Sequence, residues 1–346
     1  MSSSSSKQPS RRTYDQKFDA MTLYSSFREE VLVLTPAPTL YIPPIDLSKK
    51  GSSTQCARAP VVWFPRKEAE YIQLALQTIE TQDVKDELRR SYLPAPYVPC
   101  VLRSETDIVQ ASVLWLLHPV VKALQAQFPN VQCAAEVTVD DCRCDALISI
   151  GGRSIVVIEY KNRGNIRWSD FASGEIQDFS KNNRQAIRQR ILDGRKKDEK
   201  SDMQHNAVCL TKQAAAYATK WYVRYVALFD WDHMFLWNFA GMNFQPSQSS
   251  AATRGRGGPA LAPGHADWAF GTYVRDRRDY RSALLGFVME AYRNKNSPGF
   301  KQGKWPPFEL TPLERQKLQA QEDAKRQNQM TPQEKANKNF YQNLRR

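Results

Sequence analysis

The sequence predicts an α/β protein in which a mixed sheet is flanked by helices. First, a long apolar helix is followed by three short β-branched segments and then by a second helix, an order of α-β-β-β-α-β. Second, the strand candidates are apolar on both faces, which is typical of sheets covered by helices on both sides. Third, the 346 residues are 41% hydrophobic and 11% aromatic. This content is enough for a sizeable core and excludes a fibrous or wholly disordered chain.

The first predicted core element is a helix over about 104–128. Ser104 is a candidate N-cap, and apolar residues recur at helical spacing after it. Three antiparallel strands follow, over 134–140, 143–150 and 154–161, with a Gly-Gly hairpin turn between the last two. The pattern then predicts these remaining elements: a helix over about 205–221, strands over 222–229 and 234–239, and a last helix over about 277–294.

The segments around this core are polar or rich in proline. Nine prolines between Thr35 and Pro99 allow only one long helix there, between Arg66 and about Tyr92. The predicted organisation is a disordered tail (1–20), a Pro-rich extension with one helix (21–103), the core (104–294) with a basic insertion (163–204) and a flexible loop (245–266), and a charged Gln-rich tail (309–346).

The chain carries 49 Lys+Arg against 36 Asp+Glu, a formal net charge of +13. This excess favours a polyanionic partner, DNA or RNA, because phosphate contacts release condensed counterions. No run approaches the roughly 20 uninterrupted apolar residues of a spanning helix, so no membrane partner is expected. Six cysteines without a secretory signal predict free thiols and an intracellular protein, nuclear or cytoplasmic. No pattern indicates an oligomeric state.

Charged residues interrupt the apolar hairpin at one end. Glu159 and Lys161 are two residues apart on a strand, so their side chains share a face. A two-residue turn, Gly151-Gly152, would pair Asp145 with Ile158 and separate the carboxylates. A three-residue turn that includes Arg153 would place Asp145 opposite Glu159, and this register is the one predicted.

Two carboxylates and an ammonium in an apolar hairpin are costly unless something compensates them. Mg²⁺, or Mn²⁺ in its place, accepts one or two carboxylates and takes further oxygens from water and substrate phosphate. Lys161 then lies where it can orient a nucleophile or neutralise charge on phosphoryl oxygens. The alternative is a surface ion pair of Glu159 and Lys161, with Asp145 an unrelated acid near a turn.

The segments Arg143-Cys144-Asp145-Ala146 and Ile158-Glu159-Tyr160-Lys161 resemble the PD-(D/E)XK nuclease superfamily. That resemblance, over about 105–240, implies a restriction-endonuclease-like core and Mg²⁺-dependent phosphodiester hydrolysis. It implies that Asp145 and Glu159 are metal ligands, that Lys161 is the catalytic lysine, and that Glu105 is an additional acid from the first helix. The sequence departs from the superfamily pattern in having Cys144 in place of proline.

Two further features accompany the motif. Gln213 and Tyr217, one helical turn apart, resemble the Q-x-x-x-Y element of the RecB-like branch and are predicted to face the site. The basic insertion supplies candidate phosphate contacts, with a solvated helix face as the alternative: Arg184, Arg188, Arg190, Arg195, Lys196 and Lys197. The predicted function is a metal-dependent nuclease acting on DNA or RNA. The alternative is a catalytically inactive module of this fold that binds nucleic acid or protein.

Overall fold

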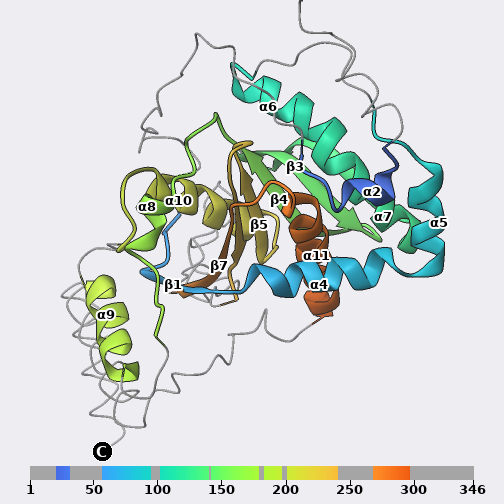
Figure 1. Ribbon diagram of the computed structural model, residues 1–346. Helices are drawn as coiled ribbons and strands as arrows, with labels where there is room; N and C mark the ends of the chain where they lie inside the picture. The colour runs from blue at the N-terminus through green and yellow to red at the C-terminus, as the bar shows by residue number, and fades with distance from the viewer. Residues whose placement is uncertain are drawn as a thin grey trace, which may run out of the picture. The chain divides into compact units, whose positions relative to one another are not determined.

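The computed structural model describes residues 21–31, 57–94, 102–139, 142–178, 183–196, 201–240 and 268–296. The two expected tails and the expected loop over 245–266 lie outside these residues. The described chain forms one mixed seven-stranded sheet flanked by helices, which confirms the predicted fold class (Figure 1).

The sheet has the order β1-β7-β6-β5-β4-β3-β2, and only the β1–β7 and β4–β5 pairs are parallel. Its strands are β1 (Val62–Pro65), β2 (Val131–Val139), β3 (Cys142–Ile150), β4 (Arg153–Tyr160), β5 (Tyr225–Phe229), β6 (Met234–Asn238) and β7 (Trp268–Val274). The three antiparallel strands after the first core helix are β2, β3 and β4, as predicted. β1 and β7 were not predicted.

The β3–β4 hairpin combines features of both registers considered from the sequence. Its turn is Gly151-Gly152, with φ of 61° and 75°, and Ile150 pairs with Arg153, so the expected three-residue turn is wrong. A β-bulge then leaves Ile155 as an extra residue on β4, because Ser149 pairs with Ser154 while Ile148 pairs with Val156. Beyond the bulge the register is the one that a three-residue turn would have produced.

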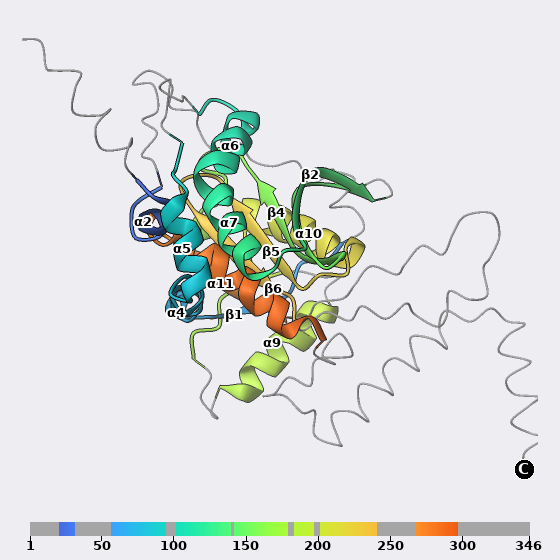
Figure 2. The same cartoon turned by 90° about the vertical axis from the view of Figure 1, so that its right-hand side faces the viewer.

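Helices cover both faces of the sheet, and Figure 2 shows several of them side by side on one face. This face carries α2 (Leu23–Ser26), α4 (Glu68–Ile79), α5 (Gln82–Arg90), α6 (Glu105–Ser112), the π-helix η1 (Val113–Leu117), α7 (His118–Gln127) and α11 (Tyr280–Arg293). The opposite face carries α8 (Trp168–Ala172) and α10 (His205–Lys220). A further helix, α9 (Arg184–Lys196), lies in the basic insertion.

The segment predicted as an extension with one helix differs from that prediction. It contains two helices, because the chain turns at Glu80 and Thr81 between α4 and α5. It also supplies edge strand β1, and α4 packs closely on α11: a Cβ on Gly286 would lie 1.9 Å from the carbonyl oxygen of Tyr71. Residues 57–94 therefore form part of the same folded unit as the core.

The first core helix is interrupted by a π-turn. Pro119 has no N–H to donate to the carbonyl of Trp115, and the helix widens so that His118 N–H donates to Val113 O. The buried Arg281 of α11 donates from Nε to the freed Trp115 carbonyl at 2.7 Å. The same guanidinium donates from Nη1 to Ser26 O at 2.7 Å. By length and composition Glu105–Gln127 could cross a membrane, but 56% of its most apolar window is buried in the fold.

Candidate active site

The candidate site lies where β4 ends. Glu159 is near the end of this strand and Lys161 directly follows it; their residues are only 3% and 6% exposed. Lys161 N–H donates to Phe229 O at 2.9 Å, which continues the pairing of β4 with β5 past the last strand residue. Tyr160, between them, points into the core on the other face. The alternation of the strand therefore directs Glu159 and Lys161 to the same face.

Lys161 joins two acids that are distant in the sequence. Its Nζ lies 2.5 Å from Glu159 Oε1 and 3.7 Å from Glu105 Oε2. Glu105 is the first residue of α6, whose start is fixed by a capping box: Ser104 accepts from Asp107 N–H, and Asp107 accepts from Ser104 N–H. Asp107 is thus used for the cap, while the neighbouring Glu105 faces the site.

Asp145 lies beside the same strand end. The Ala146–Ile158 pair, continued by one residue, brings Asp145 opposite Glu159. Asp145 Oδ2 accepts the backbone N–H of Tyr160 at 2.7 Å, so its carboxylate occupies a hydrogen-bonding position of the ladder. The two acids are close enough for the charge of Asp145 to raise the pKa of Glu159.

Helix α10 supplies the remaining predicted site residues. Gln213 and Tyr217 face the sheet together, and Gln213 Nε2 donates to Glu159 Oε1 at 2.6 Å. The same nitrogen lies 2.6 Å from the hydroxyl of Tyr217. The structure therefore brings all six site residues predicted outside the basic insertion to one end of the sheet: Glu105, Asp145, Glu159, Lys161, Gln213 and Tyr217.

Burial and charge oppose each other at this site. Burial raises the pKa of Glu159 to about 7, although the ammonium of Lys161 acts in the opposite direction. Burial lowers the pKa of Lys161, but the charges of Glu159 and Glu105 outweigh it and the net pKa is raised. Lys161 is therefore positively charged at neutral pH, while Glu159 ionises at higher pH than an ordinary glutamate.

Glu159 also holds an unpaired oxygen. Lys161 and Gln213 both bind Oε1, whereas Oε2 is buried and has no hydrogen-bond partner in the described chain. No three His, Cys, Asp or Glu side chains among the described residues converge into a complete cation site. A hard cation that takes one or two carboxylates fits this donor set, since Glu159 Oε2 and the second oxygen of Asp145 are the right ligand type.

The basic insertion is less uniform than the sequence suggested. Arg190 binds Asp202 through Nε and donates from Nη2 to Ser173 O at 2.6 Å, so it ties α9 to neighbouring loops. Arg188 is half-buried, so it does not lie on a fully solvated helix face. Three further candidates lie on α9, but their side chains are outside the described part of the structure: Arg184, Arg195 and Lys196. Lys197 lies wholly outside the described residues.

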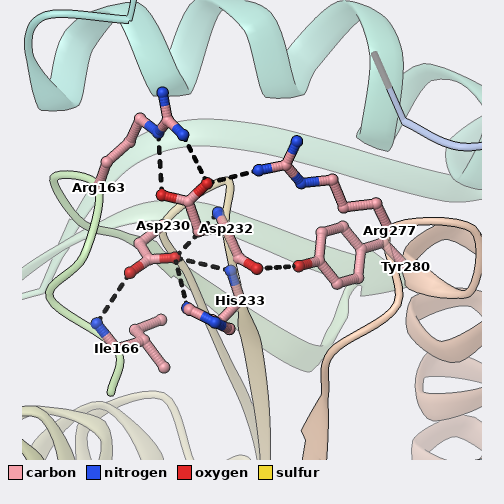
Figure 3. Close-up of polar contacts among 7 residues, drawn as sticks. All are labelled: Arg163, Ile166, Asp230, Asp232, His233, Arg277 and Tyr280. Carbon is pink, nitrogen blue, oxygen red and sulfur yellow. Dashed lines mark hydrogen bonds and ion pairs between the residues drawn. The ribbon is translucent and has the colours of Figure 1, made fainter. Parts of the chain in front are cut away.

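A second polar cluster, not predicted from the sequence, lies at the end of β5 (Figure 3). Asp230 is fully buried and accepts three backbone N–H groups, from Ile166 at 2.8 Å, Asp232 at 3.1 Å and His233 at 2.8 Å. Burial raises its pKa to about 7 despite these donors. In the sequence, Asp230-Trp231-Asp232-His233 stands between two apolar strands and by itself indicates only a turn.

Asp232 completes this cluster by bridging two arginines. Arg163, two residues after Lys161, binds it with two hydrogen bonds of 2.9 and 2.7 Å. Arg277 donates to the same carboxylate at 2.6 Å, and Tyr280 donates its hydroxyl to the Asp232 carbonyl (Figure 3). The loop after β4 is therefore anchored to the β5–β6 turn and to the start of α11.

No protein-family model, curated protein or solved structure matches this chain. The chemistry of the site therefore rests on the residues that the fold brings together, and no family membership is assigned.

Proposed function

We propose that this protein is a metal-dependent nuclease that hydrolyses phosphodiester bonds of DNA or RNA, with a PD-(D/E)XK-like site. The observation that carries the proposal is the unpaired Oε2 of Glu159, buried beside Asp145 and Lys161. A buried acceptor without a partner costs about 1–3 kcal/mol, more when it is charged. A bound Mg²⁺ or Mn²⁺ would remove this cost by acting as the missing partner of the carboxylate oxygen.

Such a cation, when bound, activates water and neutralises charge on a phosphoryl oxygen. Asp145 and Glu159 are the residues that would hold it. Binding would also draw Glu159 into its ionised form, because a nearby positive charge lowers a carboxyl pKa that burial has raised to about 7. Metal affinity would then rise with pH through the neutral range.

Lys161 and the α10 pair have separate roles in this proposal. Lys161 is held charged by Glu159 and Glu105, and its ammonium would stabilise negative charge that develops on the phosphoryl group. Gln213 and Tyr217 are positioning residues: the Gln213 amide binds Oε1 of Glu159 and so fixes the direction of Oε2. Glu105, 41% exposed, lies at the open side of the site.

One observation favours the alternative, a nucleic-acid-binding module without catalysis. Oε1 of Glu159 is already paired with Lys161 at 2.5 Å, so part of the charge is neutralised within the chain. In this alternative the +13 net charge would still attract DNA or RNA in the nucleus or cytoplasm. The two functions differ in whether divalent cations bind through Asp145.

The decisive experiment compares cleavage with metal binding. Labelled plasmid, single-stranded DNA and RNA are incubated with Mg²⁺ or Mn²⁺ and the wild type, Lys161→Ala, or Lys122→Ala as a surface lysine control on α7. We expect cleavage by the wild type and the control only. Calorimetric titration should show cation binding that Asp145→Asn abolishes. If the protein binds nucleic acid but shows neither cleavage nor cation binding that depends on Asp145, only the alternative remains.

A further inference from the structure

Three aromatic rings and one arginine form a second surface at the same end of the sheet. We call it the aromatic platform and define it as Trp168, Tyr273, His233 and Arg275. The tryptophan, tyrosine and phenylalanine side chains between Trp221 and Phe239 do not contribute a comparable surface, because apart from the exposed Tyr222 they are buried in the core. The three platform rings are half-buried, with His233 35% exposed, and Arg275 is exposed.

The rings and the guanidinium lie against one another as a chain of neighbours. His233 stacks on Tyr273 with centroids 5.3 Å apart and planes 24° apart. Tyr273 lies 5.1 Å from Trp168 at an angle of 48°. The guanidinium carbon of Arg275 lies 4.9 Å from the Trp168 ring and 5.4 Å from the Tyr273 ring. Trp168 is supported from behind by the buried Trp63, edge to face at 5.9 Å.

Arg275 differs from the other arginines near the site. Arg163 and Arg277 share the carboxylate of Asp232, and Arg167 pairs with Asp170. Within the described ranges no carboxylate forms an ion pair with Arg275, whose contacts are with the two rings. Its charge therefore remains available to an anion that approaches the platform.

The strand register relates the platform to the candidate active site. Lys161 bonds to Phe229 at the end of β5, Phe229 pairs with Met234 of β6, and Met234 pairs with Val274 of β7. His233 and Tyr273 directly precede Met234 and Val274 in the chain, so they lie at the same end of the sheet as Lys161. Three strand spacings of about 4.8 Å separate β4 from β7 by roughly 14 Å.

The platform and the acids also share a face of the sheet. Trp168 and Tyr273 pack against the apolar cluster that contains Tyr217 and Val157, on the α10 side. Glu159 lies on this side too, as its contact with Gln213 shows. A strand of nucleic acid that reached the acids across this end of the sheet would pass the platform.

We infer that the aromatic platform binds unpaired bases, so that the substrate of the proposed nuclease is single-stranded nucleic acid or a single-stranded segment beside a duplex. This inference rests on the proposed function. Bases of a single strand stack on aromatic rings and arginine planes, whereas bases in a duplex already stack on each other. Arg275 adds a charge for the adjacent phosphate.

The test measures binding without cleavage. Fluorescence anisotropy in EDTA compares a labelled single-stranded DNA, the same sequence as RNA, and the matching duplex, for the full-length chain. The variants are Arg275→Ala, Trp168→Ala and Trp168→Phe, which retains a ring if the alanine variant folds poorly. Arg278→Ala is the matched control, because Arg278 is exposed, is three residues away and pairs with Asp276.

We expect the wild type to prefer a single strand, and Trp168→Ala to weaken that binding at least about fivefold, the lower end of what one stacked base contributes. Arg275→Ala should reduce the slope of log affinity against log salt by about 0.7. Trp168→Phe and Arg278→Ala should remain near the wild type. Comparing the affinities for single-stranded DNA and for the same sequence as RNA identifies which nucleic acid is preferred.

Other results would overturn the inference in distinguishable ways. Unchanged single-strand affinity in Trp168→Ala and Arg275→Ala, with tight wild-type binding, would refute the platform but leave the proposed nuclease standing. Equal losses for single strand and duplex would refute the preference for unpaired bases. Absence of wild-type binding to every nucleic acid would overturn the proposed function together with the inference.

Discussion

Replacing Glu159 by glutamine gives a direct test of the electrostatics of the site. Glutamine retains the shape of the side chain but cannot ionise. In the folded chain burial raises the pKa of Glu159 from 4.5 to about 7. The wild type therefore carries a neutral Glu159 at acidic pH, much as the variant carries a neutral amide. We expect the two proteins to differ in stability only where the wild-type carboxyl ionises.

The sign and size of this difference follow from proton linkage. Between pH 4.5 and 7 the unfolded wild type loses the proton of Glu159 while the folded protein retains it, so the free energy of unfolding falls as pH rises. A difference of about 2.5 pKa units corresponds to about 3 kcal/mol. This loss is complete above about pH 7 and absent from Glu159→Gln. Lys161 stays charged across the whole window.

Urea unfolding in EDTA, followed by tryptophan fluorescence at pH values from 4.5 to 8, measures the difference. The free energy of unfolding of Glu159→Gln should match that of the wild type within about 1 kcal/mol near pH 4.5. Near pH 8 it should exceed the wild-type value by about 3 kcal/mol. Glu136→Gln serves as the control, since that side chain is 70% exposed. Adding Mg²⁺ at pH 8 should stabilise the wild type and not the variant.

A stability difference that does not change with pH would refute the assignment of a raised pKa to Glu159. A variant less stable than the wild type at pH 8 would show that the ionised Glu159–Lys161 pair stabilises the fold. In that case the carboxylate would be a structural partner of the lysine, and its unpaired oxygen would no longer support a cation site.

Three further substitutions test separate parts of the structure. Gly286→Ala should lower the free energy of unfolding by about 3 kcal/mol or more, measured by urea titration, because its Cβ would lie 1.9 Å from Tyr71 O. Arg190→Ala should lower the thermal midpoint without altering the salt dependence of nucleic-acid binding, since the side chain is used inside the fold. Tyr217→Phe should move the rising limb of the pH–cleavage profile to higher pH, because the hydroxyl of Tyr217 lowers the pKa of Glu159 and its loss raises that pKa.

Two residue pairs of the site follow from local geometry, whereas the meeting of Glu105 and of the helix pair with the strand acids was implied by the resemblance to the PD-(D/E)XK superfamily. Glu159 and Lys161 share a face through the two-residue period of a strand, and Gln213 and Tyr217 through one helical turn. The link from Asp145 to Glu159 depended on a hairpin register that the sequence left open. The structure reaches the expected register through a two-residue turn and a bulge at Ile155, a compensation that no turn rule specifies.

The parts that were missed depend on partners distant in the sequence. β1 is four residues long, ends in proline and forms a strand because β7 lies beside it. β7 follows a segment rich in glycine and proline and was not separated from it. The Asp230 cluster joins its own turn to Ile166, which is 64 residues away in the chain, and a linear pattern does not show this contact.

Arg281 has a consequence for how the protein folds. Its buried guanidinium binds carbonyls of α2 and of the π-turn from its place on α11, so three distant chain segments become ordered together. If α2 were detached, a cation would remain in the core without one of its acceptors. The α2 segment and the helix that runs from α6 into η1 therefore belong to one cooperative unit with α11. Glu105, at the start of α6, is held near Lys161 only when that unit is intact.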